Sequence, residues 1–285
     1  MGPWGRLVET ISSRLAFFPP SPPTYQLLTH QDGTGELYIQ PDLPQLQKVL
    51  GCDVFMVKVP RGEAHEIVAA RIPYRPPGGV QNKRILTMLY SHGNAVDMGQ
   101  LMPFFKELSS RLGCHVMGYD YSGYGCSSGT PSVRNTLANV KACFQVLKEK
   151  YNTPAKDIIL YGQSVGSGPT VYLGSEEPQL AGVVLHAPLM SGIRVLYPNL
   201  KWWPSWADVY RNYQLMPKVK APVLIMHGMK DDLIDVSHGK MLHSLAQNPV
   251  EPLYPENSNH QNLEACPEYF PTLQKFVKAM ATKSS

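Results

Sequence analysis

Residues 158–168 read Ile-Ile-Leu-Tyr-Gly-Gln-Ser-Val-Gly-Ser-Gly, and this stretch decides the fold. A short apolar run, typical of a buried strand, leads directly into Gly-x-Ser-x-Gly and then into small residues that can open a helix. This order predicts a nucleophile elbow, a strained strand-to-helix turn that exposes the hydroxyl of Ser164 at the edge of a sheet. Glycine is expected at positions 162 and 166, because side chains there would collide where strand and helix crowd together. The same pattern arises by chance in turns rich in glycine and serine, so its partners elsewhere in the chain decide its meaning.

Strands and helices alternate along most of the chain. Antiparallel strands are predicted first, around residues 54–59 and 67–74. Further strands are predicted at 85–90, 115–119, 158–161, 183–186, 223–226 and 250–254, and helices at 101–112, 133–150, 165–175, 237–247 and 268–281. Apolar strands that alternate with helices indicate a mostly parallel sheet with helices on both faces. Together with the elbow, this organisation predicts an α/β-hydrolase fold.

The chain divides into a short N-terminal segment and one domain. Over residues 4–18, apolar side chains recur every three or four positions, which predicts a short amphipathic helix. Prolines between positions 19 and 23 end it. Such a helix either lies in the plane of a membrane surface or docks on the protein itself. Residues 1–23 are therefore one segment, and residues 24–285 are a single domain with a lid-like insertion at about 188–217.

Composition excludes several classes of function. The net charge of +4 permits attraction to an anionic membrane, but no basic stripe with interleaved aromatics indicates nucleic-acid binding. The five cysteines are widely spaced and form no Cys-x-x-Cys pair, which indicates free thiols in a reducing, cytoplasmic environment. No apolar run is long enough to span a membrane, and the N-terminal segment lacks the apolar core of a secretory signal. Because neither a phosphate loop nor a metalloprotease motif is present, we expect no cofactor and no metal.

A nucleophilic serine needs a base and a group that orients the base. In this fold they follow in the order serine, acid, histidine. The predicted strand 223–226 leads into His-Gly-Met-Lys-Asp-Asp, so the acid is expected there. The spacing His-Gly-x-x-Asp favours Asp231 over Asp232 and Asp235. His260 lies in the loop after the last predicted strand, and its place in the chain makes it the expected base.

When a serine attacks a carbonyl group, the carbonyl oxygen becomes an oxyanion, and we expect backbone amides to stabilise it. One amide is expected from Val165, at the N-terminus of the helix that follows the nucleophile, where amides have no intrahelical partner. The second is expected from Asn94, in the loop after the strand at 85–90, with Gly93 and Ala95 as alternatives. His92 and Asp120 are interpreted as structural residues.

The predicted insertion at 188–217 is rich in large apolar side chains. A lid that contacts acyl chains predicts an exposed apolar patch, whereas an ordinary helical insertion would pack these residues on the core. Three tryptophans so close together are difficult to bury at once, which favours the lid. The expected substrate-binding residues are Leu189, Met190, Trp202, Trp203 and Trp206.

Several segments together resemble the α/β-hydrolase domain-containing 17 proteins, over nearly the whole chain. The resemblance implies a serine hydrolase that removes palmitate from cysteines of membrane-associated proteins. It also implies a catalytic triad on Ser164, Asp231 and His260, the residues reached above. The segments that carry the resemblance are 15–20, 92–97, 119–125, 161–164, 188–192 and 234–239.

One feature departs from that family. Its animal members carry an N-terminal cluster of palmitoylated cysteines that anchors the enzyme, whereas this chain has no cysteine before Cys52. Gly2 is followed by Pro3, which is unfavourable for myristoylation. The resemblance thus implies peripheral contact with the cytoplasmic face of plasma or endosomal membranes and S-acylated proteins as substrates, without an evident lipid anchor.

Three functions stay open on the sequence alone. The first is a palmitoyl-protein thioesterase, and the second is a carboxylesterase or monoacylglycerol lipase. The expected triad serves both equally. The third is a scaffold that keeps the hydrolase fold without catalysis, against which the complete set of Ser164, Asp231 and His260 argues.

Overall fold

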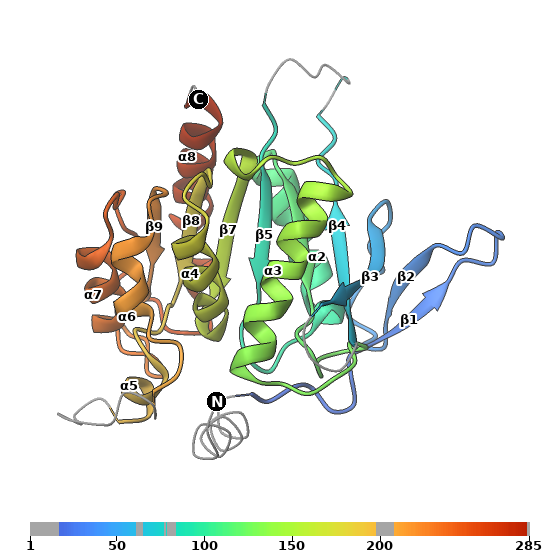
Figure 1. The fold of residues 1–285 in the computed structure, drawn as a ribbon, viewed down its shortest axis with the longest axis horizontal. Helices are drawn as coiled ribbons and strands as arrows, with labels where there is room; N and C mark the ends of the chain where they lie inside the picture. The colour runs from blue at the N-terminus through green and yellow to red at the C-terminus, as the bar shows by residue number, and fades with distance from the viewer. Residues whose placement is uncertain (1–16, 61–64, 77, 79–83, 198–207, 284–285) are drawn as a thin grey trace.

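A mixed β-sheet forms the centre of the protein (Figure 1). The computed structural model describes residues 17–283 except 61–64, 77, 79–83 and 198–207. Within this part of the chain the sheet has the strand order β1-β2-β3-β4-β6-β5-β7-β8-β9. The strands are β1 (Tyr25–Thr29), β2 (Leu37–Pro41), β3 (Asp53–Val59), β4 (His65–Ile72), β5 (Thr87–Ser91), β6 (His115–Tyr119), β7 (Ile158–Gln163), β8 (Gly182–His186) and β9 (Val223–Met226).

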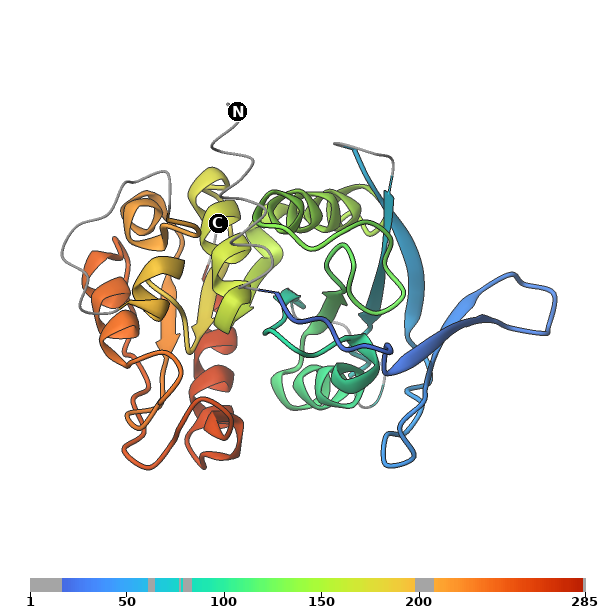
Figure 2. The ribbon, with the colours of Figure 1, turned by 90° about the horizontal axis from the view of Figure 1, so that it is seen from below.

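Helices cover both faces of this sheet. In Figures 1 and 2, α3 and α4 lie on one face, and α2 and α8 lie on the other. The helices are α2 (Met98–Leu112), α3 (Val133–Glu149), α4 (Ser167–Glu176), α5 (Gly192–Leu196), α6 (Asn212–Leu215), α7 (Ser237–Leu245) and α8 (Tyr269–Thr282). Short 3₁₀ turns are η2 (Ala155–Asp157), η3 (Ser164–Gly166), η5 (Met216–Lys218) and η6 (Leu263–Ala265). The predicted α/β-hydrolase architecture is confirmed.

The relative direction of neighbouring strands changes at β6. From β1 to β4, and between β4 and β6, neighbouring strands are antiparallel, whereas from β6 through β5, β7 and β8 to β9 they are parallel. Parallel strands place their carboxyl ends at one edge of the sheet, and the loops that leave those ends can converge on one site.

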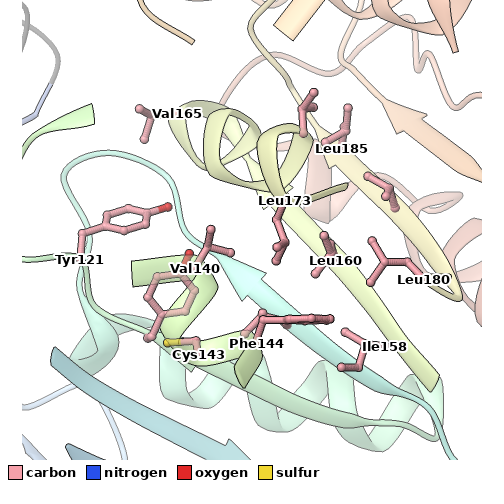
Figure 3. Close-up of a cluster of buried hydrophobic side chains, with 14 of the residues drawn as sticks. Tyr121, Val140, Cys143, Phe144, Ile158, Leu160, Val165, Leu173, Leu180 and Leu185 are labelled. Atoms are coloured by element: carbon pink, nitrogen blue, oxygen red, sulfur yellow. The ribbon is translucent and has the colours of Figure 1, made fainter. Parts of the chain in front are cut away.

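Alternate residues of the central strands enter separate cores. Leu89 of β5 and Leu160 of β7 are buried under α3 and α4, whereas their neighbours Met88 and Ile159 are buried under α2 and α8. Figure 3 shows the first core, in which Phe144 of α3 lies near Leu160. This period of two explains why the strands are almost continuously apolar, since both faces are covered.

The predicted last strand at 250–254 is only partly formed. Val250 and Leu253 donate hydrogen bonds to the carbonyls of Val223 and Ile225, both at 2.9 Å, but only isolated bridges result. Pro252 lies between the two donors and has no N–H to add to the ladder. This segment nevertheless runs parallel to β9 and leads directly to His260.

The first two strands were not predicted from the sequence. β1 and β2 form an antiparallel hairpin that projects from the body of the protein (Figure 2). Leu27, Leu28 and Thr29 of β1 are all at least partly exposed, so the strand has no clear apolar alternation. Its anchor is Tyr25, which is buried and donates a hydrogen bond of 2.6 Å to Asp120.

The predicted amphipathic helix at 4–18 lies almost wholly outside the described residues. Phe18, which the prediction places on its apolar face, has no helical structure and is 56% exposed. Its neighbour Phe17 is buried instead, with its ring 6.4 Å from that of Tyr210. Pro19 accounts for the difference, since a residue that precedes proline disfavours helical geometry.

No helix within the described ranges is both long enough and apolar enough to cross a membrane.

Helix α2 begins three residues earlier than predicted because Asp97 caps it. The Asp97 carboxylate accepts the amide of Gly99 at 3.1 Å, the amide of Thr24 at 2.8 Å and the Thr24 hydroxyl. The residue is fully buried. It therefore joins the start of α2 to the start of β1.

We expect Asp97→Ala to lower the free energy of unfolding by about 2 kcal/mol, because it removes a helix cap and leaves buried donors unpaired. Urea unfolding followed by tryptophan fluorescence measures this change. Asp32→Ala is the matched control, since the hydrogen bonds that Asp32 accepts within the described ranges come from Thr34 in an exposed turn. The control should change stability by less than about 0.5 kcal/mol. Equal losses in both variants would contradict the role given to Asp97.

Candidate active site

Ser164 occupies a strained turn between β7 and α4. Its backbone φ is 53°, in the left-handed region that non-glycine residues rarely adopt. A Cβ atom on Gly162 would lie 2.5 Å from the Thr170 hydroxyl, and one on Gly166 would collide with the Ser91 carbonyl. Both glycines are therefore required by close packing, as the sequence predicts, and the turn has the geometry of a nucleophile elbow.

The structure brings Ser164, His260 and Asp231 into one hydrogen-bonded chain. His260 Nε2 lies 3.1 Å from Ser164 Oγ, and His260 Nδ1 lies 2.7 Å from Asp231 Oδ2. The carboxylate accepts only, so Nδ1 carries the proton and Nε2 is left to accept the serine proton. This is the arrangement that a serine nucleophile needs.

Asp231 is held as an ion without contact with water. Its side chain is fully buried, and Oδ1 accepts the backbone amides of Leu233 at 3.0 Å and Ile234 at 2.8 Å. His227 Nε2 lies 3.1 Å from Oδ2. Burial alone would raise the pKa of Asp231, but the hydrogen bonds from His227, His260 and Ile234 outweigh burial and hold this pKa well below its usual range.

The competing aspartates lie elsewhere. Asp232 is exposed, and Asp235 is exposed and accepts the amide of Ser237 at the start of α7. The choice of Asp231 among the three thus agrees with the geometry of the loop.

Two loops are tied together to bring acid and base into contact. Lys230 donates its amide to the carbonyl of Ser258 at 2.9 Å, so the loop after β9 runs beside the loop that carries His260. On either side of His260, Asn259 and Asn262 each accept the other's backbone amide through their side chains, at 2.7 and 3.1 Å. This reciprocal pair fixes the turn that presents the imidazole.

The loop after β5 lies against the elbow, where the second oxyanion amide is expected. Gly166 packs against the carbonyls of Ser91 and His92, so this loop and η3 are in direct contact. The side chain of Asn94 holds this loop in place, because its Oδ1 accepts the Phe18 amide and the Tyr124 hydroxyl, each at 2.8 Å. The oxyanion role of the backbone amides of Asn94 and Val165 stays a prediction.

His92 is buried and structural. Its Nδ1 lies 2.7 Å from the Gly93 carbonyl and its ring packs 4.1 Å from that of Tyr121. Burial lowers its pKa to about 4, so it is neutral at physiological pH. Asp120 is also fully buried and accepts the amide of Met98 at 2.9 Å in addition to the Tyr25 hydroxyl.

The structure describes two of the five residues that the sequence predicts to bind substrate in the lid. Leu189 is buried in the core shared with α3 and α4, and Met190 is half-buried. Trp202, Trp203 and Trp206 lie outside the described residues. The insertion contains α5, α6 and η5.

Ser167 and His227 are two further residues that support the site. Ser167 Oγ donates to the carbonyl of Ser164 at 2.6 Å and accepts the amide of Leu189 at 3.2 Å, which joins the elbow to the start of the insertion. Their positions in the sequence could have indicated both residues, because Ser167 directly follows the elbow and His227 lies four residues before Asp231. Over the described ranges, no three histidine, cysteine or carboxylate side chains are grouped so that they could hold a metal ion.

Similarity to known proteins agrees with this geometry. The family model for serine aminopeptidase, S33, matches residues 82–215. Human alpha/beta hydrolase domain-containing protein 17B is 38% identical over 271 residues, which cover 94% of this chain and 90% of that protein. This chain belongs to the α/β-hydrolase domain-containing 17 family. Alpha/beta hydrolase domain-containing protein aho-3 of Caenorhabditis elegans is 44% identical over 197 residues, covering 69% of this chain and 58% of that protein.

Solved structures share the fold at low identity. An esterase from Pyrococcus furiosus superposes with a TM-score of 0.64 at 16% identity, covering 80% of this chain and 92% of its own. An esterase domain from Rhodothermus marinus gives a TM-score of 0.58 at 15% identity, over 80% and 98% of the two chains. These structures show the fold, and the family itself is one of hydrolase domain-containing proteins.

The buried His92 makes stability depend on pH. Its folded-state pKa of about 4 lies below the usual 6.5, so the unfolded chain binds the extra proton between these values. The contribution of His92 to the free energy of unfolding is fully present above pH 6.5. It falls as the pH drops toward 4, by about 3 kcal/mol in total. We expect His92→Asn to reduce the slope of unfolding free energy against pH over this window, measured by urea titrations, whereas the slope that comes from His186 remains.

Tyr121→Phe is the control for that measurement. It removes the hydroxyl that donates to the His92 carbonyl at 2.7 Å but leaves the imidazole in place. Its curve should lie below the wild-type curve and run parallel to it. A parallel curve for His92→Asn would overturn the assignment of the pH dependence to His92.

Proposed function

We propose that this protein is a serine hydrolase that cleaves long-chain S-acyl thioesters, such as S-palmitoyl groups, from cysteines of membrane-associated proteins. The observation that carries the proposal is the chain of contacts from Ser164 Oγ to His260 Nε2 and from His260 Nδ1 to the buried Asp231, at 3.1 and 2.7 Å. The two distances match what nucleophile, base and orienting acid require.

The proposed cycle has two half-reactions. Ser164 Oγ attacks the thioester carbonyl carbon while His260 takes its proton, and the amides of Val165 and Asn94 stabilise the oxyanion. The C–S bond then breaks, and the cysteine sulfur leaves with the proton from His260. In the second half, water attacks the acyl-serine and gives a proton to His260, which returns it to Ser164 Oγ as the fatty acid leaves. Asp231 orients His260 and stabilises its charged form throughout.

Exposed apolar side chains on the loops of the site support a long acyl substrate. Met229 and Leu233 flank Asp231 and are 39% and 60% exposed. Phe18, 56% exposed, is tied by its amide to Asn94, and Tyr197, 59% exposed, follows α5 in the insertion. Apolar groups left in water around a polar site favour a partly apolar ligand or a lipid surface. We therefore also propose peripheral membrane contact at this face, with Met190 and the predicted lid tryptophans, Trp202, Trp203 and Trp206, near the acyl chain.

The family supports the same proposal in a coarser way. The relatives that cover most of the chain are named as hydrolase domain-containing proteins, which supports hydrolysis. The thioester as the bond cleaved is our inference from the sequence resemblance together with the exposed apolar side chains on the loops named above.

We expect a fluorophosphonate probe to label the wild-type protein and to leave Ser164→Ala unlabelled. Asp231→Asn should lower kcat on a p-nitrophenyl ester by about 10³- to 10⁴-fold, because an amide in place of the carboxylate no longer holds the reactive tautomer of His260.

Asp232→Asn is the matched control for Asp231→Asn. Asp232 is the exposed neighbour, so its replacement should leave kcat within about twofold. Absence of labelling in the folded wild-type protein would sink the hydrolase proposal. Equal losses in the two aspartate variants would overturn the assignment of Asp231.

The thioester proposal is tested on two peptides that differ only in a palmitoyl-cysteine or a palmitoyl-serine. We expect kcat/KM, relative to the uncatalysed rate of each peptide, to favour the thioester by about tenfold or more. The free pKa of a cysteine thiol is about 8.5, so the leaving thiolate needs little protonation. A preference for the oxygen ester would instead favour a carboxylesterase or monoacylglycerol lipase.

The same assay tests whether the acyl chain contacts the loop that carries Leu233. Leu233→Ser should slow cleavage of palmitoyl-cysteine but not of acetyl-cysteine, since only the long chain reaches apolar surface. Leu50→Ser, at a residue that is 71% exposed in the segment between β2 and β3, should slow neither. Equal effects of Leu233→Ser on both substrates would contradict acyl contact at this loop.

A further inference from the structure

Gln163, the residue before Ser164, joins three segments of the site through its side chain. Its Oε1 accepts the hydroxyl of Tyr90 at 2.8 Å, at the end of β5. Its Nε2 donates to Glu264 Oε1 at 2.9 Å. The same side chain packs against Gly93 in the loop after β5. One amide therefore spans the nucleophile strand, the loop expected to hold the oxyanion, and the turn η6.

Glu264 belongs to the segment that carries His260. It lies four residues after the histidine, in η6, where the preceding Leu263 is fully buried and anchors the turn in the core. The Glu264 side chain is only 28% exposed. Its hydrogen bond with Gln163 thus links the His260 loop directly to the residue beside Ser164.

Other groups near Glu264 do not replace this bond. His186 Nδ1 is 3.7 Å from Glu264 Oε1, but it lies closer to the Tyr161 hydroxyl, at 2.9 Å. Burial lowers the pKa of His186 to about 3, so it carries no charge to pair with the carboxylate. Burial raises the pKa of Glu264, while the hydrogen bond from Gln163 and the charge of His260 oppose that rise.

We propose that Gln163 and Glu264 are positioning residues that fix the distance between His260 and Ser164. This inference rests on the proposed serine hydrolase function. The Ser164–His260 contact changes in every cycle, because the proton of that bond is transferred. The Gln163–Glu264 bond takes no part in proton transfer and so persists through both half-reactions. A misplacement of about 1 Å between reacting groups can cost about 10²-fold in rate.

The proposal is tested by steady-state kinetics on a soluble p-nitrophenyl ester. Glu264→Ala removes the acceptor and should lower kcat by about 10- to 100-fold, with KM changed by less than about twofold. Glu264→Gln keeps an oxygen acceptor and should retain kcat within about threefold.

An exchange of the two side chains separates positioning from general stability. Gln163→Glu alone sets two carboxylates against each other and should lower kcat at least as much as Glu264→Ala. The double variant Gln163→Glu/Glu264→Gln again places one amide N–H against one carboxylate oxygen, and it should recover kcat by about tenfold over the single Gln163→Glu variant. Glu256→Ala, at an exposed residue before His260, is the control and should leave kcat unchanged.

Urea unfolding and fluorophosphonate labelling complete the experiment. Equal kcat for Glu264→Ala and wild type, or a double variant no more active than Gln163→Glu, would overturn the positioning role. A loss of kcat that merely follows a loss of folded protein in the unfolding curves would overturn it as well. If the folded wild-type protein neither labels nor turns over, the proposed function fails instead, so the two failures are distinguishable.

Discussion

The left-handed backbone at Ser164 is the constraint on which the rest of the site depends. A non-glycine residue in this conformation costs about 1–3 kcal/mol, so the surrounding packing has to hold it there. Gly162 and Gly166 provide that packing, because their lack of side chains lets α4 press against β7 and against the end of β5. The same contact that strains Ser164 brings the loop after β5 beside it. One close approach therefore fixes both the turn of Ser164 and the position of the loop in which the second oxyanion amide is expected.

The electrostatics of the site follow from how its ionisable groups are buried. Asp231 is kept ionised by several donors, while His92 and His186 are kept neutral, because burial lowers the pKa of each. His260 lies between these groups, with a side chain that is 14% exposed. A buried fixed negative charge beside a partly exposed imidazole favours a proton that moves onto the imidazole and back. The buried groups around the His260 imidazole therefore keep fixed protonation states, with Asp231 charged and His92 and His186 neutral.

The sequence predicts this site well because its parts are local patterns that recur in a fixed chain order. The elbow, the aspartate after β9 and the final loop histidine each follow an apolar run that is recognisable by itself. Contacts between distant polar residues have no such pattern. Gln163 and Glu264 are 101 positions apart, and Thr24 and Asp97 are 73 apart, so nothing in either local sequence indicates the partner. The exposed hairpin of β1 and β2 was missed for a related reason, since its stability comes from Tyr25 and not from alternation.

Phe17 and Phe18 contact the body of the protein near the site, although the prolines after Phe18 mark a boundary in the sequence. Phe17 is buried in the core beside Tyr210, and the amide of Phe18 donates to Asn94 Oδ1. The Tyr124 hydroxyl donates to that same oxygen, so the loop after β5 is held from two sides. Because this loop also packs against the elbow, its shape depends on residues that precede the first strand. A single hydrogen bond from the Phe18 amide thus joins the residues before the prolines to the loop in which the second oxyanion amide is expected.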